Sequence, residues 1–306
     1  FMKKILIIKH GSLGDIIFSL QSMFSIKKKY TDFSIDILTE KKYVNFFLKS
    51  KIFDNIIIDD RKNLIFQTII LLFSLSKNKY ELIIDLQNSQ RTSLYNLFFR
   101  IFSRSKISSS RSFSHSRYKI PSQGSETVME GLSNQLQLIG IKNTDDINYN
   151  WLKIDIREKS KKPIALFLPG VSKAGSYKQW QPNKFAQIAN YYEKKGFKIC
   201  VLGTKEDLDS CLPIIENCND VINEIDKSPP EVIYSYALMS SIIFSNDTGP
   251  GHIAALAKKN IVWLANDNNI SKANLPKGKH IYKILDNSVK NISADRVINF
   301  IKENNL

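Results

Sequence analysis

The sequence lacks any run of about 18 consecutive apolar residues, the length that a membrane-spanning helix requires. The longest candidate, residues 64–75, is interrupted by Gln67, Thr68 and Ser74, and this pattern predicts a buried helix. A secretory signal is also lacking, because the short apolar run near the start ends at Lys9 and no small-residue cleavage site follows it. These absences exclude membrane-spanning and secreted proteins, and we expect the chain in the cytoplasm.

Cysteine is scarce. The three residues, Cys200, Cys211 and Cys218, are too few and too unevenly spaced for a disulfide framework or a zinc site. Their odd number also fits a reducing compartment. We expect all three thiols to be structural.

Acidic residues are outnumbered: 44 Lys and Arg against 29 Asp and Glu give a net charge of +15. Acids are absent from residues 91–119, which nevertheless contain seven basic residues: Arg91, Arg100, Arg104, Lys106, Arg111, Arg117 and Lys119. Such a stretch indicates an anionic partner, which could be nucleic acid, a phosphorylated glycolipid or a membrane surface. The alternative is a solvated basic face.

The 306 residues, 43% of them hydrophobic, fit about two globular domains. Short β-branched runs alternate with helical stretches, which is typical of parallel sheets covered by helices on both faces. The expected strands are residues 3–8, 34–38, 55–59 and 81–86, then 163–170, 197–203, 240–247 and 260–265. A polar stretch separates the two groups, so the pattern predicts an α/β protein of two Rossmann-like domains facing across a cleft, residues 1–155 and 156–306. Ligands of such sheets bind beyond the carboxyl ends of the strands.

The loop after the first strand is one such place. Gly11 and Gly14 permit a tight turn there, but the dinucleotide fingerprint G-x-G-x-x-G is missing. An acid at a helix start repels a pyrophosphate, so Asp15 is either a stabilising helix N-terminal acid or a catalytic carboxylate.

The loop after residues 163–170 is basic. Gly170 and Gly175 have the spacing of a phosphate-binding P-loop, but Ser176-Tyr177 stands where Lys-Ser/Thr is required. Lys173 and Lys178 could reach a diphosphate; alternatively the loop is solvated and Trp180 anchors it.

The segment Ser245–His252 lies between a strand and a helix. Thr248, Gly249 and Gly251 offer a hydroxyl and backbone N–H groups at a helix start, which suits a phosphate. His252 either faces that ligand or is packed in the core, and Asp247 could cap the helix instead.

These motifs together resemble the bacterial heptosyltransferase family of lipopolysaccharide inner-core synthesis, which has the two-domain GT-B fold. Three segments carry the resemblance in order: S-x-G-D (Ser12 to Asp15), P-G…K-x-W (Pro169, Gly170, Lys178, Trp180) and N-D-[ST]-G-x-x-H-x-A-A (Asn246 to Ala255). Weaker matches are Ile84 to Gln87 and Leu138 to Ile141. The likeness spans nearly the whole chain. It departs at Leu13, where the family often has Met, and at Pro250, where Leu often follows Thr-Gly.

The resemblance implies an inverting glycosyltransferase that moves heptose from ADP-heptose to an anionic inner-core glycolipid. Residues 1–155 would bind the acceptor and residues 156–306 the nucleotide sugar. Asp15 would be the catalytic base, and Lys178 would offset charge on the leaving diphosphate. The implied donor-binding residues are Ser12, Gly14, Pro169, Gly170, Lys178, Glu206, Asp247, Thr248, Gly249 and His252.

The same resemblance places acceptor-binding arginines in the first domain: Arg61, Arg111 and Arg117. It implies no cofactor beyond the donor substrate, and peripheral attachment at the inner face of the inner membrane. No metal site is expected, because the only D-x-D, Asp207 and Asp209, lies in a predicted helix rather than after a strand.

Two other classes compete with this interpretation. A nucleic-acid-binding protein would use residues 91–119, but aromatic residues there have the spacing of a core face, so nucleic acid is not the expected partner. A nicotinamide oxidoreductase is disfavoured by the missing fingerprint. A glycosyltransferase with a different nucleotide-sugar donor also remains open, since the chain is somewhat short for the family.

Overall fold

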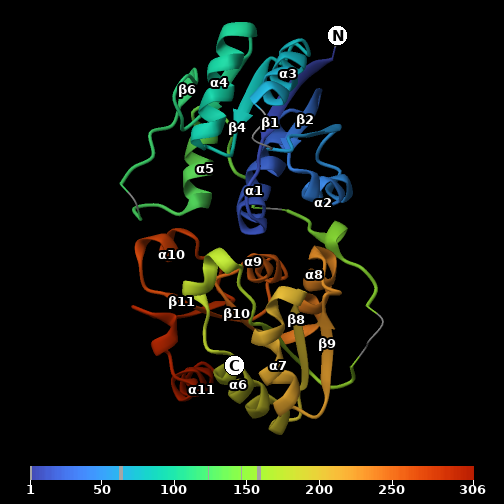
Figure 1. The fold of residues 1–306 in the computed structure, drawn as a ribbon, viewed down its shortest axis with the longest axis vertical. Helices are drawn as coiled ribbons and strands as arrows, with labels where there is room; N and C mark the ends of the chain where they lie inside the picture. Colours follow the sequence, from blue (N-terminus) through green and yellow to red (C-terminus); the bar gives the residue numbers. More distant parts are fainter. Residues whose placement is uncertain (1, 62–64, 123, 146, 157–159) are drawn as a thin grey trace. The chain divides into compact units, whose positions relative to one another are not determined.

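The computed structural model describes residues 2–61, 65–122, 124–145, 147–156 and 160–306. The chain divides into two compact units (Figure 1): unit 1 ends at Trp151 and unit 2 begins at Leu152. The expected boundary lay four residues later, between residues 155 and 156.

Unit 1 is built on one parallel sheet with the strand order β3-β2-β1-β4-β5-β6. Its strands are β1 (Lys3–Ile8), β2 (Phe33–Thr39), β3 (Asn55–Ile58), β4 (Leu82–Asp85), β5 (Lys106–Ser109) and β6 (Ser116–Arg117). Its α-helices are α1 (Leu13–Lys29), α2 (Val44–Ser50), α3 (Ile65–Ser76), α4 (Gln90–Phe102) and α5 (Val128–Gln137).

The chain reverses its direction across this sheet after β3. Right-handed crossovers therefore put α1 and α2 on one face and α3 and α4 on the other. Leu6 and Ile8 of β1 share a buried cluster with Leu72 of α3 and Phe99 of α4, whereas α1 contacts α5. The loops that follow the strands meet at one edge of the sheet, which we call the carboxyl edge.

Unit 2 repeats the architecture with the strand order β12-β11-β10-β7-β8-β9, again all parallel. The strands are β7 (Ile164–Leu168), β8 (Lys198–Gly203), β9 (Val221–Ile225), β10 (Ser240–Asn246), β11 (Ile261–Asn266) and β12 (Ile281–Asp286). The helices are α6 (Pro182–Lys194), α7 (Leu208–Asn217), α8 (Pro230–Met239), α9 (Gly249–Ala255), α10 (Asn269–Ala273) and α11 (Ala294–Glu303), with short 3-10 helices η3 (Lys173–Lys178) and η4 (Lys205–Asp207).

All eight predicted strands are present, and four more were missed. Three of the missed strands, β6, β9 and β12, are sheet edges, and the fourth, β5, lies beside an edge. Edge strands need fewer apolar residues, and β9 carries Asn223 and Glu224 while β12 carries Lys283.

The three cysteines are free and buried, and burial raises the pKa of Cys211 to about 12.

The helix predicted at residues 64–75 is confirmed as α3, but its predicted burial is wrong for one face. Leu72 and Leu75 are buried in the core of unit 1. Phe66 and Ile70 are instead 78% and 60% exposed. Apolar residues on all sides of a helix predict burial, but among the described residues of unit 1 only one side of α3 packs into the core.

A matched pair of variants distinguishes the two faces of α3. We expect Leu72→Ala to lower the free energy of unfolding by about 2–5 kcal/mol, because it leaves a cavity in the core. Ile70→Ala should change it by less than about 0.5 kcal/mol, because the side chain is exposed. Urea unfolding followed by circular dichroism measures both, and equal effects would contradict this assignment of the faces.

Candidate functional site

The first strand of unit 1 ends in a turn that only glycine can make at position 11. Gly11 has φ +111°, and a Cβ atom there would lie 2.7 Å from Asp15 Oδ2. The turn leads directly into α1, whose N-cap is Ser12. It therefore fixes Asp15 at the carboxyl edge, beside the end of β1.

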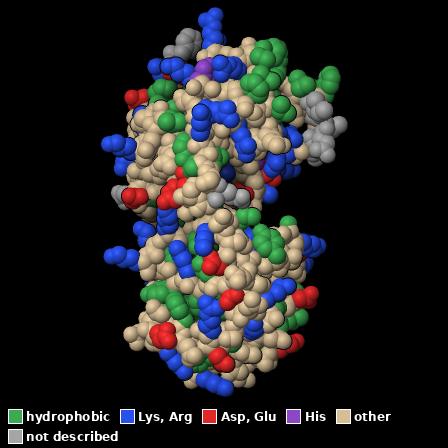
Figure 2. All heavy atoms as spheres, turned by 90° about the vertical axis from the view of Figure 1, so that its left-hand side faces the viewer, with side chains coloured by type: hydrophobic (Ala, Val, Ile, Leu, Met, Phe, Trp, Pro, Cys, Tyr) green, Lys and Arg blue, Asp and Glu red, His purple; other side chains and the backbone are tan. Residues whose placement is uncertain are grey.

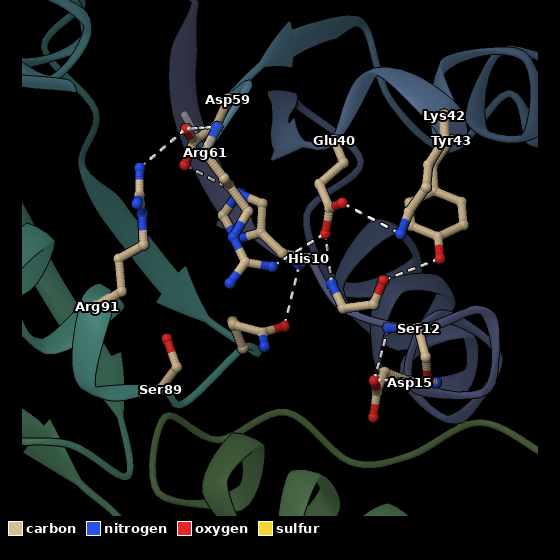
Figure 3. Close-up of polar contacts among 12 residues, drawn as sticks. His10, Ser12, Asp15, Glu40, Lys42, Tyr43, Asp59, Arg61, Ser89 and Arg91 are labelled. Atoms are coloured by element: carbon tan, nitrogen blue, oxygen red, sulfur yellow. Dashed lines mark hydrogen bonds and ion pairs between the residues drawn. The ribbon is translucent and has the colours of Figure 1, made fainter. Parts of the chain in front are cut away.

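Asp15 forms a capping box with Ser12. Its Oδ2 accepts hydrogen bonds from the Ser12 backbone N–H at 2.8 Å and from Ser12 Oγ at 2.7 Å, while the Asp15 N–H donates to Ser12 Oγ. Within the described part of the chain no hydrogen bond reaches Oδ1, which points away from the turn (Figure 3). The sequence left open a helix acid or a catalytic carboxylate; Asp15 acts as a helix acid through Oδ2, and the cap does not use Oδ1.

Glu40 follows β2 and joins the first loop to Arg61. Its Oε1 accepts hydrogen bonds from the Gly11 N–H at 2.9 Å and from Arg61 Nη1 at 3.1 Å, and Lys42 pairs with Oε2 at 3.1 Å. Burial tends to raise the pKa of Glu40, but these donors hold it below its usual range. Tyr43 completes the contact by donating to the Gly11 carbonyl at 2.9 Å.

Asp59 follows β3 and is the buried centre of a second group (Figure 3). Tyr95 Oη donates to Asp59 Oδ2 at 2.7 Å, and His10 Nε2 lies 3.3 Å from the same oxygen. The Arg61 N–H donates to Oδ1 at 3.0 Å, and Arg91 Nη2 lies 3.5 Å from it. Asp59 therefore holds Arg61 at the edge, in a left-handed conformation with φ +49°.

Electrostatics keep the Asp59 carboxylate ionised. Burial by itself raises the pKa of this carboxyl, but the hydrogen bonds from His10, Tyr95 and the Arg61 backbone lower it well below the ordinary 3.8. Tyr95 responds in the opposite sense, since burial and the hydrogen bond to Asp59 raise its pKa. The Asp59 carboxylate therefore carries a fixed negative charge, which pairs with the Arg91 guanidinium group.

The three predicted acceptor-binding arginines do not form one cluster. Arg61 follows β3, near one end of the sheet, whereas Arg111 follows β5 and Arg117 lies in β6, at the other end. With about 4.8 Å between neighbouring strands, β3 and β5 are about 19 Å apart. Arg111 Nε donates to the Asn88 carbonyl, and Arg117 Nε donates to the Ser110 carbonyl at 3.4 Å.

Sequence reasoning missed His10, Glu40 and Asp59 as members of this edge. The available signal was their position, because His10 and Glu40 come two residues after predicted strands and Asp59 is the last residue of one. It also counted Arg91 in an exposed basic stretch. Arg91 instead turns inward to Asp59, Tyr95 Oη and Thr68 Oγ1.

In unit 2 the structure brings together three predicted donor residues, Lys178, Asp247 and His252. Lys178 Nζ lies 2.7 Å from Asp247 Oδ2, and His252 Nε2 lies 3.5 Å from Asp247 Oδ1. Burial tends to raise the pKa of Asp247, but His252 and Lys178 hold it below its usual range. His252 is buried and packs against Trp263, with ring centroids 4.8 Å apart.

The loop that carries Lys178 is held in place from beneath. The Trp180 ring is fully buried and its Nε1 donates to the Ile292 carbonyl, which confirms the expected anchor. Asn246 at the end of β10 accepts from the Trp180 N–H and donates to the Pro169 carbonyl at 2.7 Å. Gln179 donates to that same carbonyl at 2.9 Å. These bonds fix Pro169 and Lys178 at the carboxyl edge of β7 and β10.

Gly170 faces η4, the 3-10 helix after β8. A Cβ atom at position 170 would lie 2.2 Å from the Asp207 carboxyl, so this glycine permits the close approach. Asp207 accepts hydrogen bonds from the Thr204 N–H and hydroxyl, both at 2.8 Å, and so caps η4. Glu206, beside it, is exposed.

The start of α9 follows β10. Thr248, not Asp247, is the N-cap residue, and its side chain makes no capping hydrogen bond. Gly251 is needed for packing, because a Cβ atom there would lie 2.3 Å from Ser245 Oγ. Thr248 and Gly249 remain at the edge, next to the Lys178–Asp247 pair.

Two further observations concern the described residues as a whole. No three His, Cys, Asp or Glu side chains among them gather as a metal site would need. No helix in the described ranges is long and apolar enough to cross a membrane.

The Asp59 group makes stability depend on pH. We expect Asp59→Asn to lower the free energy of unfolding by about 1–3 kcal/mol at pH 7, because the Tyr95 hydroxyl and the Arg61 N–H lose their carboxylate acceptor. The folded pKa lies below the ordinary 3.8, so the wild-type advantage is complete above that value and is lost as the pH falls further below it.

Unfolding measured from pH 7 to pH 2 checks this expectation. Asp60→Asn, a change at the neighbouring exposed carboxylate, is the control and should have little effect. A constant difference between wild type and Asp59→Asn at every pH would contradict the assignment.

Solved structures with the same fold cover almost the entire chain. They include a glycosyl transferase of family 9 from Veillonella parvula DSM 2008, with 20% identity, a TM-score of 0.79 and coverage of 99% of this chain and 97% of that one. Escherichia coli ADP-heptose lps heptosyltransferase II has 17% identity, a TM-score of 0.75 and 98% coverage of both chains. E. coli heptosyltransferase WaaC with ADP-2-deoxy-2-fluoro heptose has 15% identity, a TM-score of 0.76 and coverage of 98% and 99%.

These likenesses confirm the predicted fold class, GT-B with two Rossmann-like parallel-sheet domains. No curated protein sequence matches the chain. The sequence profile of glycosyltransferase family 9 (heptosyltransferase) matches residues 71–264, more than half of the chain. The match includes the Lys178 loop and the Asp247–His252 segment, so the chain belongs to glycosyltransferase family 9, the heptosyltransferase family.

Proposed function

We propose that this glycosyltransferase moves a heptose or a related sugar from an ADP-sugar to an anionic inner-core lipopolysaccharide acceptor, with inversion. The observation that carries the proposal is Asp15, a carboxylate fixed at the carboxyl edge with one oxygen free for a ligand. The similar WaaC has been solved with ADP and with an ADP-heptose analogue, which supports an ADP-sugar donor here.

In the proposed reaction Asp15 Oδ1 takes the proton of the attacking acceptor hydroxyl. The hydroxyl oxygen forms a bond to the anomeric carbon while the bond to the diphosphate oxygen breaks on the opposite side, which inverts the configuration. The capping bonds to Ser12 fix the carboxylate, and Gly14 lets the acceptor or donor approach the turn. Unit 1 supplies this base and unit 2 the donor site.

Unit 2 offsets the charge of the leaving diphosphate in this proposal. Lys178 contacts a phosphate oxygen, and Asp247 and His252 position the Lys178 ammonium group. Thr248 and the Gly249 N–H add hydrogen bonds. Pro169, Gly170 and the exposed Glu206 border the nucleotide, with Glu206 as a ribose ligand. No metal ion is required for this arrangement, because the cation is built into the loop.

The acceptor site in this proposal spans the carboxyl edge of unit 1. Arg61 is its best-positioned arginine, since Asp59 and Glu40 hold it near Asp15. Arg111 and Arg117 would contact more distant carboxylates or phosphates of the same glycolipid. The chain would work at the inner face of the inner membrane. Nucleic acid is disfavoured, because Arg91 of the basic stretch turns inward to Asp59, Tyr95 and Thr68.

Replacing the proposed base tests the mechanism. We expect Asp15→Ala to lower kcat by about 10²–10⁴, the contribution of a positioned general base, with donor affinity nearly unchanged. Steady-state transfer assays and calorimetric titration of the donor measure the two quantities.

Glu130→Ala is the control for the stability that Asp15→Ala loses with its helix cap. Glu130 forms the same capping box with Thr127 at the start of α5, so both variants should lose about 1 kcal/mol of stability. Only Asp15→Ala should lose activity. Unchanged turnover in folded Asp15→Ala would remove Asp15 from the reaction.

Lys178 tests the donor site separately. We expect Lys178→Ala to lose about 1.5–3 kcal/mol of ADP-sugar binding, the range for a charge-assisted hydrogen bond. Lys173→Ala is the matched control, since Lys173 lies exposed in the same 3-10 helix. Equal affinities of the two variants in calorimetry would refute the assigned role of Lys178.

A further inference from the structure

The exposed side of α3 carries an apolar stripe along its whole length, with the exposed polar residues Gln67 and Ser74 beside it. Four residues recur at helical spacing i, i+3, i+4 and i+7, and their side chains are 78%, 45%, 60% and 46% exposed: Phe66, Ile69, Ile70 and Phe73. α3 itself contains no charged residue. Leu72 and Leu75 on the inner side already supply its core contacts. The core of unit 1 therefore does not explain why the exposed residues on the outer side of α3 are apolar.

α4 extends this surface. Leu94, Phe98, Ile101 and Phe102 share one side of α4 at spacing i, i+4, i+7 and i+8, and all but Phe98 are exposed. The ring of Phe73 lies 5.8 Å from that of Phe102 and 6.1 Å from that of Phe98. The two helices thus form one continuous surface, the α3–α4 face, made of these four residues and the four of α3. Figure 2 shows hydrophobic side chains gathered at the upper right of the picture, with Lys and Arg side chains nearby.

The surroundings of the α3–α4 face are basic. The sequence has no Asp or Glu in residues 61–80 or 86–125. Exposed cations lie in the last turn of α4 or follow the ends of both helices: Lys77, Lys79, Arg100, Arg104 and Lys106. Lys77 Nζ lies 5.5 Å from the centre of the Phe73 ring. Of the two intervening acids, Glu81 pairs with Lys3 at 3.3 Å and Asp85 is fully buried. An apolar surface with a positive border matches an anionic bilayer, because the apolar side chains suit the acyl chains and the cations suit the anionic headgroups.

A second copy of the chain fits this surface less well. A symmetric dimer would place the same basic border of each copy against the other, and like charges at an interface disfavour association. We infer that the α3–α4 face binds the surface of an anionic lipid bilayer, with its apolar side chains among the headgroups and upper acyl chains. The role of this face rests on the proposed function, because that function supplies an acceptor anchored in a membrane.

The position of the face suits such an acceptor. Phe66 lies in the first turn of α3, five residues after Arg61, and Arg91 at the start of α4 contacts Thr68 of α3. The α3–α4 face therefore begins at the carboxyl edge that holds the proposed acceptor site. A glycolipid in the bound bilayer and that site lie on the same side of unit 1.

Vesicle sedimentation with the full chain tests the inference, without donor or acceptor. Vesicles of phosphatidylethanolamine and phosphatidylglycerol should bind the wild-type chain, and vesicles of phosphatidylcholine should bind it much less. Phe66→Ser with Ile70→Ser should lower the partition coefficient about tenfold or more without changing the charge. Leu48→Ser with Leu138→Ser is the matched control, because these leucines of unit 1 are 60% and 54% exposed but lie outside the face.

The electrostatic part has its own variant. Lys77→Gln with Lys79→Gln should weaken binding to the anionic vesicles only, and added salt should reduce wild-type binding. Equal binding of the Phe66/Ile70 and Leu48/Leu138 variants would overturn the inference. So would a wild-type dimer in sedimentation velocity that the Phe66/Ile70 variant loses, since the face would then join two copies.

A transfer assay with a water-soluble, delipidated acceptor separates this inference from the proposed function. The Phe66/Ile70 variant should keep the wild-type rate there, because neither side chain belongs to the proposed site. Absence of transfer by the wild-type chain, with the vesicle pattern as expected, would contradict the proposed function and leave the membrane-binding face supported.

Discussion

The parallel direction of all strands in each sheet is the constraint from which the rest of this structure follows. Parallel strands send every following loop to one edge, so residues from distant parts of the sequence meet there without any loop having to be long. In unit 1 this brings Gly11, Glu40, Asp59 and Arg61 together. In unit 2 it places Lys178 against Asp247. The sheet topology thus determines which residues meet at each candidate site, and their side chains determine what the site can bind.

The two sites hold charge in different ways. Unit 1 places the buried carboxylate of Asp59 behind the exposed Arg61. The carboxylate accepts hydrogen bonds from Tyr95 and the Arg61 backbone N–H, and His10 Nε2 lies 3.3 Å away. Unit 2 places Asp247 behind Lys178, with His252 on its other side. Asp247 pairs directly with the Lys178 ammonium group, whereas Asp59 holds the Arg61 backbone and Glu40 holds its guanidinium group. A cation held this way loses less side-chain entropy when an anion binds than a free surface lysine or arginine would.

Much of this architecture was accessible from the sequence, and the failures have physical causes. The central strands were found because strands buried on both faces are continuously apolar, as in Ile164–Leu168. The edge strands β6, β9 and β12 were missed because one side of an edge faces solvent and tolerates polar residues. The loops at Asp15, Lys178 and Asp247 stood out because each directly follows an apolar strand. Glu40 also comes soon after a predicted strand and Asp59 ends one, but single acids without a glycine or a motif gave no reason to choose them.

The burial of α3 was mispredicted because hydropathy records only that a side chain avoids water, and not which apolar medium replaces it. Periodicity also cannot reveal that Asp59 fixes Arg61, because that contact depends on the left-handed conformation of residue 61. Such a conformation is set by the surrounding hydrogen bonds rather than by local preference.

The capping box at the start of α1 has a consequence for the timing of turnover. The Asp15 oxygen that accepts the bonds from Ser12 belongs to the same carboxyl group that takes the acceptor proton in the proposed reaction. A neutral carboxylic acid is a weaker acceptor than a carboxylate, and it no longer complements the positive end of the helix dipole. Each proton transfer to Asp15 therefore loosens the first turn of α1, and the turn tightens again only when that proton leaves to solvent.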